Sequence, residues 1–171
     1  MIDEGFGRTI QRQQVTDLYA AERDGVFRSL IVVGLGRAKA EESTQEAFLR
    51  LYTALQNGLV IDSPRAWVYR VAHNLAVDAL GREARESNSL GAVIETEASS
   101  NGNAEAGLIR AESLENLRAA VARLSKQQRL CLELRAEGLR YQDIAKVLQI
   151  RTSTVGEFLR RAIQQLRKYN L

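Results

Sequence analysis

Residues 138–162 constrain the fold most strongly, because their apolar side chains recur at the spacing of two short helices joined by a turn. The first helix would place Ile144 and Leu148 on one face, and Ala145 is small where two crossing helices would touch. Ile150 would lie in the turn. The inward positions of the second helix are Val155, Phe158 and Leu159. This pattern predicts a helix-turn-helix, whose second helix enters the major groove of DNA.

The outward positions of this segment, in the turn and on the second helix, are polar. They are Arg151, Thr152, Ser153, Thr154, Glu157, Arg160 and Arg161. Short hydroxyl side chains near the start of a helix, with arginines further along, suit a surface that contacts base edges and phosphates. The residues alone leave a second interpretation open, in which the two helices form a hairpin that only packs and the charged face is solvated.

The charge of the chain is unevenly distributed. Residues 112–171 hold twelve Lys or Arg and six Asp or Glu, a net charge of +6. Residues 1–111 hold twelve and fifteen, a net charge of −3, and the two segments together give the +3 of the whole chain. The excess of positive charge therefore accompanies the helix-turn-helix, where neutralisation of phosphates would require it.

The composition predicts an all-α fold. A chain of 171 residues, 45% of them apolar, suits one domain or two small ones. A single proline, many strong helix formers and few β-branched runs favour helices over strands. Cys131 lacks a cysteine partner and suits a buried apolar position, and His73 lacks a second metal ligand. We therefore expect neither metal nor cofactor, and no enzymatic activity.

The sequence also bears on location. No apolar run approaches the ~20 residues that a membrane span needs. The first residues lack the basic start and the apolar stretch of a signal peptide. We therefore expect a cytoplasmic protein in a reducing environment.

Two helices are predicted in the first third of the chain. One begins at Val15, after a loosely ordered stretch, and ends at Gly34; Gly25 weakens its middle. The other covers residues 40–55 and has a polar, acidic side. That side consists of Glu41, Glu42, Gln45 and Glu46 with one apolar residue, Leu49. Acidic residues in a first turn suit the positive end of the helix dipole, and a surface that binds a partner is the alternative.

A third helix is predicted to follow a polar loop that contains Asn57. Ser63 and Pro64 are a capping residue and a first helical residue, and Trp67 begins an apolar stripe. The other faces carry Arg65, Tyr69, Arg70, His73, Asn74 and Asp78. A basic and aromatic face can bind single-stranded nucleic acid by stacking and phosphate contact. A solvated face remains the alternative at this point.

The composition changes after residue 86. Residues 87–107 are small, polar and aperiodic, which predicts a flexible linker between a first domain at 1–86 and a second at 108–171. The second domain opens with a helix near Leu108. Ser125 and Gln128 then form a capping box at the start of the helix that precedes the helix-turn-helix.

Together these segments resemble a sigma factor of bacterial RNA polymerase, of the extracytoplasmic-function class that keeps only sigma regions 2 and 4. Residues 40–52 are similar to the pattern A-E-D-x-x-Q-E-x-F-x-x-x-[WY] of region 2.2. Residues 63–78 resemble the run P-R-A-W-L-x-x-[IV]-A-x-N-x-x-x-D of regions 2.3 and 2.4. Residues 124–129 with the helix-turn-helix resemble region 4. The resemblance covers about residues 15–86 and 110–168.

The resemblance implies a role for each of three surfaces. Docking on the clamp helices of the largest subunit of core RNA polymerase is expected of Glu41, Glu42, Gln45, Glu46 and Leu49. Recognition of the minus-10 promoter element is expected of Asn57, Arg65, Tyr69, Arg70, Asn74, Asp78 and Arg82. Recognition of the minus-35 element is expected of the polar face of the helix-turn-helix given above. Trp67 is expected in the core, and an anti-sigma protein is a possible further partner.

Some positions depart from the family pattern. In the family, arginines usually come directly after the aspartate of region 2.4, whereas here Ala79, Leu80 and Gly81 separate Asp78 from Arg82. In the turn of the helix-turn-helix, Gln149 occupies a position where glycine is usual. A positive φ at Gln149 would strain the backbone. Three more departures lie in the second helix of the motif, at Gly156, Glu157 and Phe158, where Lys, Ser and Arg are common.

Two other classes of protein fit the sequence less well. A response-regulator-like activator or repressor would share the helix-turn-helix, but it would need a sensory domain, and residues 1–86 show no strand pattern. A helical enzyme would need a metal-ligand cluster, a nucleophile with its base, or a phosphate-binding loop, and none is evident in the sequence.

Overall fold

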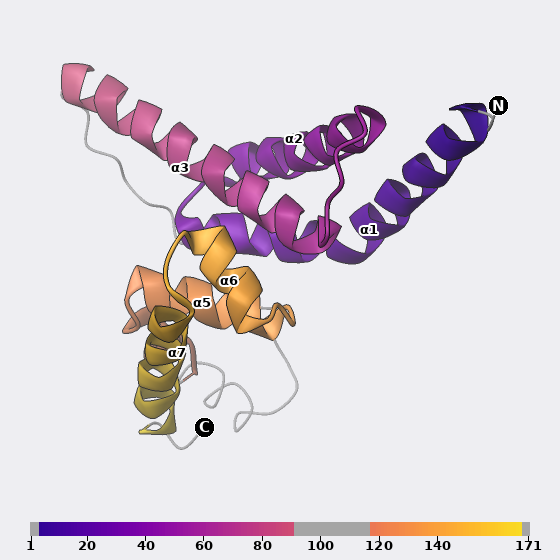
Figure 1. Ribbon diagram of the computed structural model, residues 1–171. Helices are drawn as coiled ribbons and strands as arrows, with labels where there is room; N and C mark the ends of the chain where they lie inside the picture. Colours follow the sequence, from indigo (N-terminus) through magenta and orange to yellow (C-terminus); the bar gives the residue numbers. More distant parts are fainter. Residues whose placement is uncertain (1–3, 91–116, 169–171) are drawn as a thin grey trace, which may run out of the picture.

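The computed structural model describes residues 4–90 and 117–168, and it describes the side chains of residues 11–86 and 117–168. Across these residues the secondary structure is α-helical, without strands, which confirms the predicted all-α class. A first unit consists of α1 (Glu4–Val33), α2 (Arg37–Gln56) and α3 (Pro64–Leu90). A second unit consists of the helical residues 117–122 with α5 (Lys126–Ala136), α6 (Tyr141–Leu148) and α7 (Thr152–Arg167). Figure 1 shows α5–α7 as a cluster beside α1 and α3.

Two boundaries differ from the sequence prediction. Helix α1 begins at Glu4, so the expectation of a loose segment before Val15 is wrong for residues 4–15. The segment holds no proline, and Gln11 Nε2 donates to the carbonyl of Leu55 at 3.2 Å, which ties it to the end of α2. Helix α3 continues to Leu90, into the first residues of the predicted linker. The remainder of that linker falls mostly outside the described residues.

The helix termini follow the predicted capping signals. Ser63 Oγ accepts from the amide of Ala66 at 3.3 Å, with Pro64 as the first helical residue. At α5 the capping box is complete: Ser125 Oγ accepts from the amide of Gln128 at 3.2 Å, and Gln128 Oε1 accepts from the amide of Ser125 at 2.9 Å. These local bonds fix where each helix begins.

The predicted helix-turn-helix is confirmed as α6 and α7. Val155, Leu159 and Ala162 are the buried residues of α7, and Ile144 and Val147 are buried in α6. The turn passes through Gln149, which has φ 55° and ψ 42° and is the single non-glycine residue with positive φ in the described part of the chain. The expected backbone strain at this position is therefore present.

The two units share one hydrophobic core. Helix α5 packs on α1, and α6 packs on α3. The core extends from Val26 and Leu30 of α1 through Ala72 of α3 to Leu134 and Ile144 of the second unit, and all five side chains are buried. The predicted tether therefore joins two units that lie in contact over apolar surface. In the part of the chain with described placement, no helix has the length and apolarity needed to cross a membrane.

Candidate functional site

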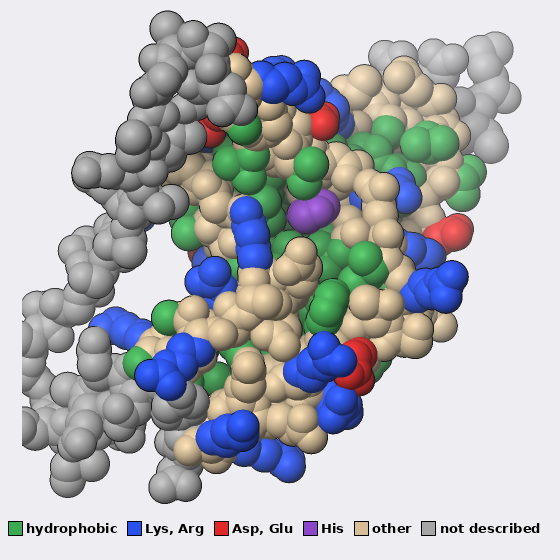
Figure 2. Space-filling view, turned by 90° about the vertical axis from the view of Figure 1, so that its left-hand side faces the viewer, with side chains coloured by type: hydrophobic (Ala, Val, Ile, Leu, Met, Phe, Trp, Pro, Cys, Tyr) green, Lys and Arg blue, Asp and Glu red, His purple; other side chains and the backbone are tan. Residues whose placement is uncertain are grey.

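The outer face of α7 carries the polar residues predicted from the sequence. Arg151, Thr152, Ser153, Arg160 and Arg161 are exposed, and Thr154 and Glu157 are partly exposed. Figure 2 shows Lys and Arg side chains gathered on the lower part of one side of the molecule, where the second unit lies. The structure thus brings the hydroxyl residues and the arginines together on one helix surface, as the sequence predicted.

Glu157 holds both arginines of this face. Its Oε1 accepts from Arg160 Nη2 at 2.8 Å and from Arg161 Nε at 2.7 Å, and its Oε2 accepts from Arg160 Nε at 3.0 Å. The hydrogen bonds from Arg160 and Arg161 lower the pKa of Glu157, and the bond to Glu157 raises the pKa of Arg160. The carboxylate is therefore ionised at neutral pH and offsets part of the positive charge of this face.

Helix α2 presents the predicted polar face to solvent. Glu41, Glu42, Gln45 and Leu49 are exposed, and the Leu49 side chain is 60% exposed although it is apolar. Glu46 is half-buried and accepts from Arg50 Nε at 2.7 Å. Because α2 begins at Arg37, the first turn holds no acidic residue. The dipole explanation for Glu41 and Glu42 is therefore wrong, since that effect fades beyond the first turn.

A hollow between α2 and α3 adjoins this face. It is lined by Glu42, Gln45 and Leu49 of α2 and by Leu75 and Arg82 of α3, among others. Arg82 was predicted to belong to the nucleic-acid surface. The structure places it in the lining of this hollow, together with Glu42 and Gln45 of the α2 face. The hollow thus brings charged residues of α2 and Arg82 of α3 together around two apolar side chains, Leu49 and Leu75.

The predicted nucleic-acid face of α3 is only partly exposed. Arg70, Asn74, Asp78 and Arg82 are exposed, as is Asn57 in the preceding loop. Tyr69 is 1% exposed, so the expectation that its ring lies on an open face is wrong. Its hydroxyl donates to Glu22 Oε2 of α1 at 3.2 Å. Burial raises the pKa of Tyr69, and the neighbouring charges of Glu22 and Glu137 raise it further.

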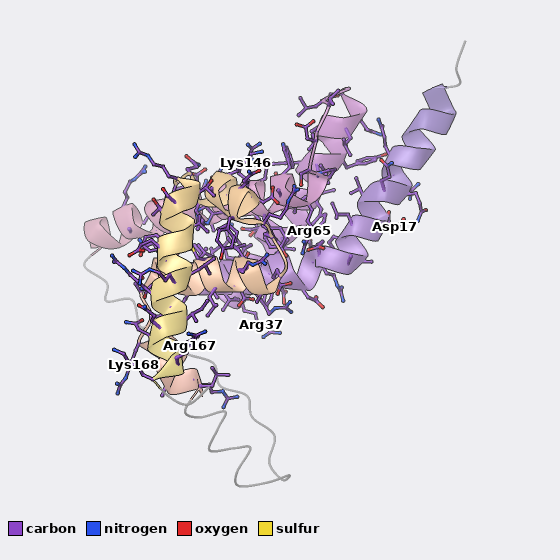
Figure 3. All side chains as sticks on the ribbon, turned by 60° about the horizontal axis from the view of Figure 1, so that its bottom comes forward. Asp17, Arg37, Arg65, Lys146, Arg167 and Lys168 are labelled. Carbon is purple, nitrogen blue, oxygen red and sulfur yellow. The ribbon has the colours of Figure 1, made fainter. Side chains whose placement is uncertain are left out.

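A group of charged residues, of which only Arg65 was predicted as a site residue, lies where the two units meet. Arg28 of α1 pairs with Glu137 through Nη2 and Oε1 at 2.5 Å, and with Glu133 at 3.4 Å. Arg65 of α3 pairs with Glu22 at 2.7 Å and donates to the carbonyl of Glu137. Figure 3 shows Arg65 where α1 and α3 approach the second unit. Contacts between residues this far apart in the chain leave no periodic signal in the sequence.

One further hydrogen bond joins the units. Gln149 Nε2, in the turn of the helix-turn-helix, donates to Asn74 Oδ1 of α3 at 3.1 Å.

His73 of α3 is partly buried. Its pKa is lowered mainly by burial and further by the positive charge of Lys126. Cys131 is fully buried, as predicted, and burial raises its pKa to about 11. Among the side chains with described positions, no group of His, Cys, Asp and Glu could hold a metal ion.

Comparison with known proteins gives the following similarities. Residues 10–86 match the family Sigma-70 region 2, and residues 114–166 match Sigma-70, region 4. The chain is 30% identical over 178 residues to the RNA polymerase sigma-H factor of Pseudomonas aeruginosa, covering 97% of this chain and 92% of that protein. It is 28% identical over 155 residues to the ECF RNA polymerase sigma factor SigE of Mycolicibacterium smegmatis, covering 90% of this chain and 60% of that protein.

Solved structures share the fold. The sigma factor RpoE in complex with the anti-sigma factor NepR, from Bartonella quintana, is similar with a TM-score of 0.70 at 19% identity, covering 92% of this chain and 94% of that one. CnrH in complex with the cytosolic domain of CnrY is similar with a TM-score of 0.55 at 18% identity, covering 97% and 96%. At these identities the likeness concerns the arrangement of helices.

Proposed function

The chain belongs to the sigma-70 family of bacterial RNA polymerase subunits, in its extracytoplasmic-function class, and we infer from this that it binds core RNA polymerase and directs initiation at specific promoters. It is an initiation factor and not an enzyme. The observation that carries this conclusion is the match of two family regions in the family order, the second of which ends in the basic helix-turn-helix.

We assign residues 1–86 to sigma region 2, 87–107 to the linker and 108–171 to sigma region 4. The proposed docking surface for core polymerase is the α2 face, with Glu41, Glu42, Gln45, Glu46 and Leu49. Two observations support it: the acidic residues lie beyond the first turn, and Leu49 is an exposed apolar side chain among charges. An apolar residue ringed by polar ones is typical of a protein interface.

The proposed minus-10 surface combines the loop after α2 with α3. Asn57, Arg70, Asn74, Asp78 and Arg82 are exposed and available to nucleic acid. Arg65 donates to the carbonyl of Glu137 in the second unit, and Tyr69 is buried and donates to Glu22 of its own unit, so both side chains would have to rearrange before they bind nucleic acid. The proposed minus-35 surface is Arg151, Thr152, Ser153, Thr154, Glu157, Arg160 and Arg161, with hydroxyls toward base edges and arginines toward phosphates.

A further partner and a location complete the proposal. Both similar structures are complexes, one with the anti-sigma factor NepR and one with the cytosolic domain of CnrY, so an anti-sigma protein is a candidate partner of this chain. The proposed site of action is the cytoplasm, where core polymerase and promoter DNA meet.

Run-off transcription tests the function. Core polymerase is supplied with genomic fragments, with and without the full chain, and new transcripts with defined starts are expected only when the chain is present. A regulator with a similar helix-turn-helix would instead bind its operator without polymerase. Sequence-specific binding to duplex DNA by the free chain, without any stimulation of core enzyme, would overturn the proposal.

A further inference from the structure

We propose that the surface which docks core polymerase extends from α2 across the neighbouring hollow onto α3, where Leu75 and Arg82 contact the polymerase. This inference rests on the proposed function, because it takes the α2 face to be the docking surface. It gives Leu75 a role beyond packing, and it gives Arg82 a contact that does not need DNA.

The hollow between α2 and α3 is continuous with the α2 face. Glu42, Gln45 and Leu49 of that face line it, and Leu75 and Arg82 of α3 lie on its other side. Figure 1 shows α2 and α3 beside one another, and the two helices pack together. A partner that buries the side chains of the α2 face toward α3 must therefore also cover the hollow and the α3 residues that line it.

Leu49 and Leu75 give the hollow an apolar centre. Leu49 is exposed, and Leu75 is partly buried against the core. A second hollow follows along α2; it shares Leu49 and is lined on the α3 side by Trp67 and Val71. Because Trp67, Val71 and Leu75 are spaced by four residues on one helix, they form a single stripe along α3. A strip of apolar side chains between two helices suits the apolar face of a helix in the partner.

The charged groups around this centre leave one cation over. Lys39 Nζ lies 2.8 Å from Glu42 Oε2, and Arg50 Nε lies 2.7 Å from Glu46 Oε1, so these four charges are already paired within α2. Among the side chains with described positions, Arg82 is the lining cation that forms no ion pair. Complementary charge then calls for a carboxylate on the partner. The polymerase segment should therefore carry an apolar side chain for the centre of the hollow and an acidic one for Arg82.

Nucleic acid fits this hollow less well than polymerase. Glu42 and Glu46 line it together with Arg82, so a phosphate bound to Arg82 there would face like charges. Its centre is aliphatic, and the described residues of its lining include no aromatic ring on which a base could stack. The occupant that the hollow favours is therefore a protein segment.

Charge reversal of Arg82 tests the contact without DNA. Arg82 is exposed, so Arg82→Glu should leave the fold intact, which circular dichroism checks. We expect the affinity of the full chain for purified core polymerase, measured by fluorescence in the absence of DNA, to fall about tenfold or more, because like charges would then meet. Arg85→Glu makes the same charge change about one turn further along α3, outside the lining of both hollows, and should leave this affinity unchanged.

Leu75→Ala tests the apolar centre in the same assay. We expect the affinity for core polymerase to fall by about fivefold or more, because a side chain at the centre of an interface is lost. Leu75 is partly buried, so urea unfolding checks that the variant remains folded under the assay conditions. Val77→Ala is the matched control, since Val77 is an exposed apolar residue of α3 outside both hollows.

The inference is overturned if Arg82→Glu binds core polymerase as tightly as Arg85→Glu does, or if Leu75→Ala binds it as tightly as Val77→Ala does. Failure of the wild-type protein to bind core polymerase would instead overturn the proposed function. The two failures are therefore distinguishable in one set of measurements.

Discussion

Arg28 and Glu137 lie 109 residues apart in the sequence, and their Nη2 and Oε1 atoms lie 2.5 Å apart in the structure. The hydrogen bond to Glu137 outweighs desolvation and raises the pKa of Arg28. Glu133 shares the same arginine, and burial is the main reason that its pKa is raised. Because Arg28 is half exposed, each pair contributes about 1 kcal/mol or less. Their importance lies in orienting one unit on the other.

The α2 surface is tested by Glu42→Lys combined with Gln45→Ala. We expect weaker binding to core polymerase, because charge reversal at an interface penalises both encounter and docking. Affinity is measured by fluorescence with purified core enzyme, and circular dichroism checks the fold. Asp17→Lys on α1 makes a similar charge change outside the α2 face and serves as the control. Unchanged affinity of the double variant would remove α2 as the docking surface.

Two substitutions on α7 should behave differently. Arg160→Ala should weaken holoenzyme binding to all minus-35 sequences alike and reduce the salt slope by about one unit, because a phosphate contact is lost. Thr154→Ala should instead change which minus-35 sequences are used. Filter binding of holoenzyme across a range of salt measures both effects. If both variants match wild type in affinity, preference and slope, α7 is not the reading helix.

Glu157 should limit the affinity of α7 for DNA. Glu157→Gln removes a carboxylate that is bonded to Arg160 and Arg161, so both arginines become available to phosphates. We expect tighter binding of holoenzyme to every minus-35 sequence and a steeper salt dependence. Weaker binding confined to promoters with cytosine at one position would show that Glu157 reads a base instead.

Gly156 lies in α7 without a steric reason for glycine. A Cβ there would be 3.9 Å from Tyr141 Cε2, an ordinary contact. Gly156→Ala should therefore stabilise the protein by about 0.5–1 kcal/mol in urea unfolding, because alanine favours the helix. Gly138→Ala is the matched control: φ is +86° there, so the same added methyl group should destabilise. Loss of stability in Gly156→Ala would contradict the described packing.

His73 should make stability depend on pH. Burial and Lys126 lower its pKa, so the unfolded chain binds the proton more strongly than the folded one. Stability should therefore rise with pH between the lowered pKa and about 6.5, and it should fall on acidification through this window. His73→Gln should lose this part of the pH dependence in urea unfolding. Glu133, whose pKa is also shifted, is present in both proteins and contributes the same pH dependence to each. Parallel pH profiles for the two proteins would refute the assignment.

Local features of this chain could be predicted from the sequence because they depend on neighbouring residues. The capping bonds at Ser63 and Ser125 and the two helices around Gln149 arise from contacts within about one helical turn. The α2 face was identified for the same reason, since i, i+3 and i+4 spacing decides which side chains share a surface. The start of α1 and the end of α3 were predicted wrongly, because weak propensities compete there with tertiary contacts.

What covers each face was decided only by the tertiary structure. Periodicity placed Tyr69 on a polar side of α3, but the folded chain buries its ring and its hydroxyl donates to Glu22 of α1. From the sequence, Gly25 only weakened a predicted helix. The structure gives the reason for glycine, because a Cβ atom at this position would lie 2.5 Å from Glu137 Oε2. The sequence by itself determined two helical units, a helix-turn-helix and the charged surfaces, because these follow from local spacing. The contact between the two units depends on pairs more than 70 residues apart, such as Arg65 with Glu137, for which helical periodicity holds no information.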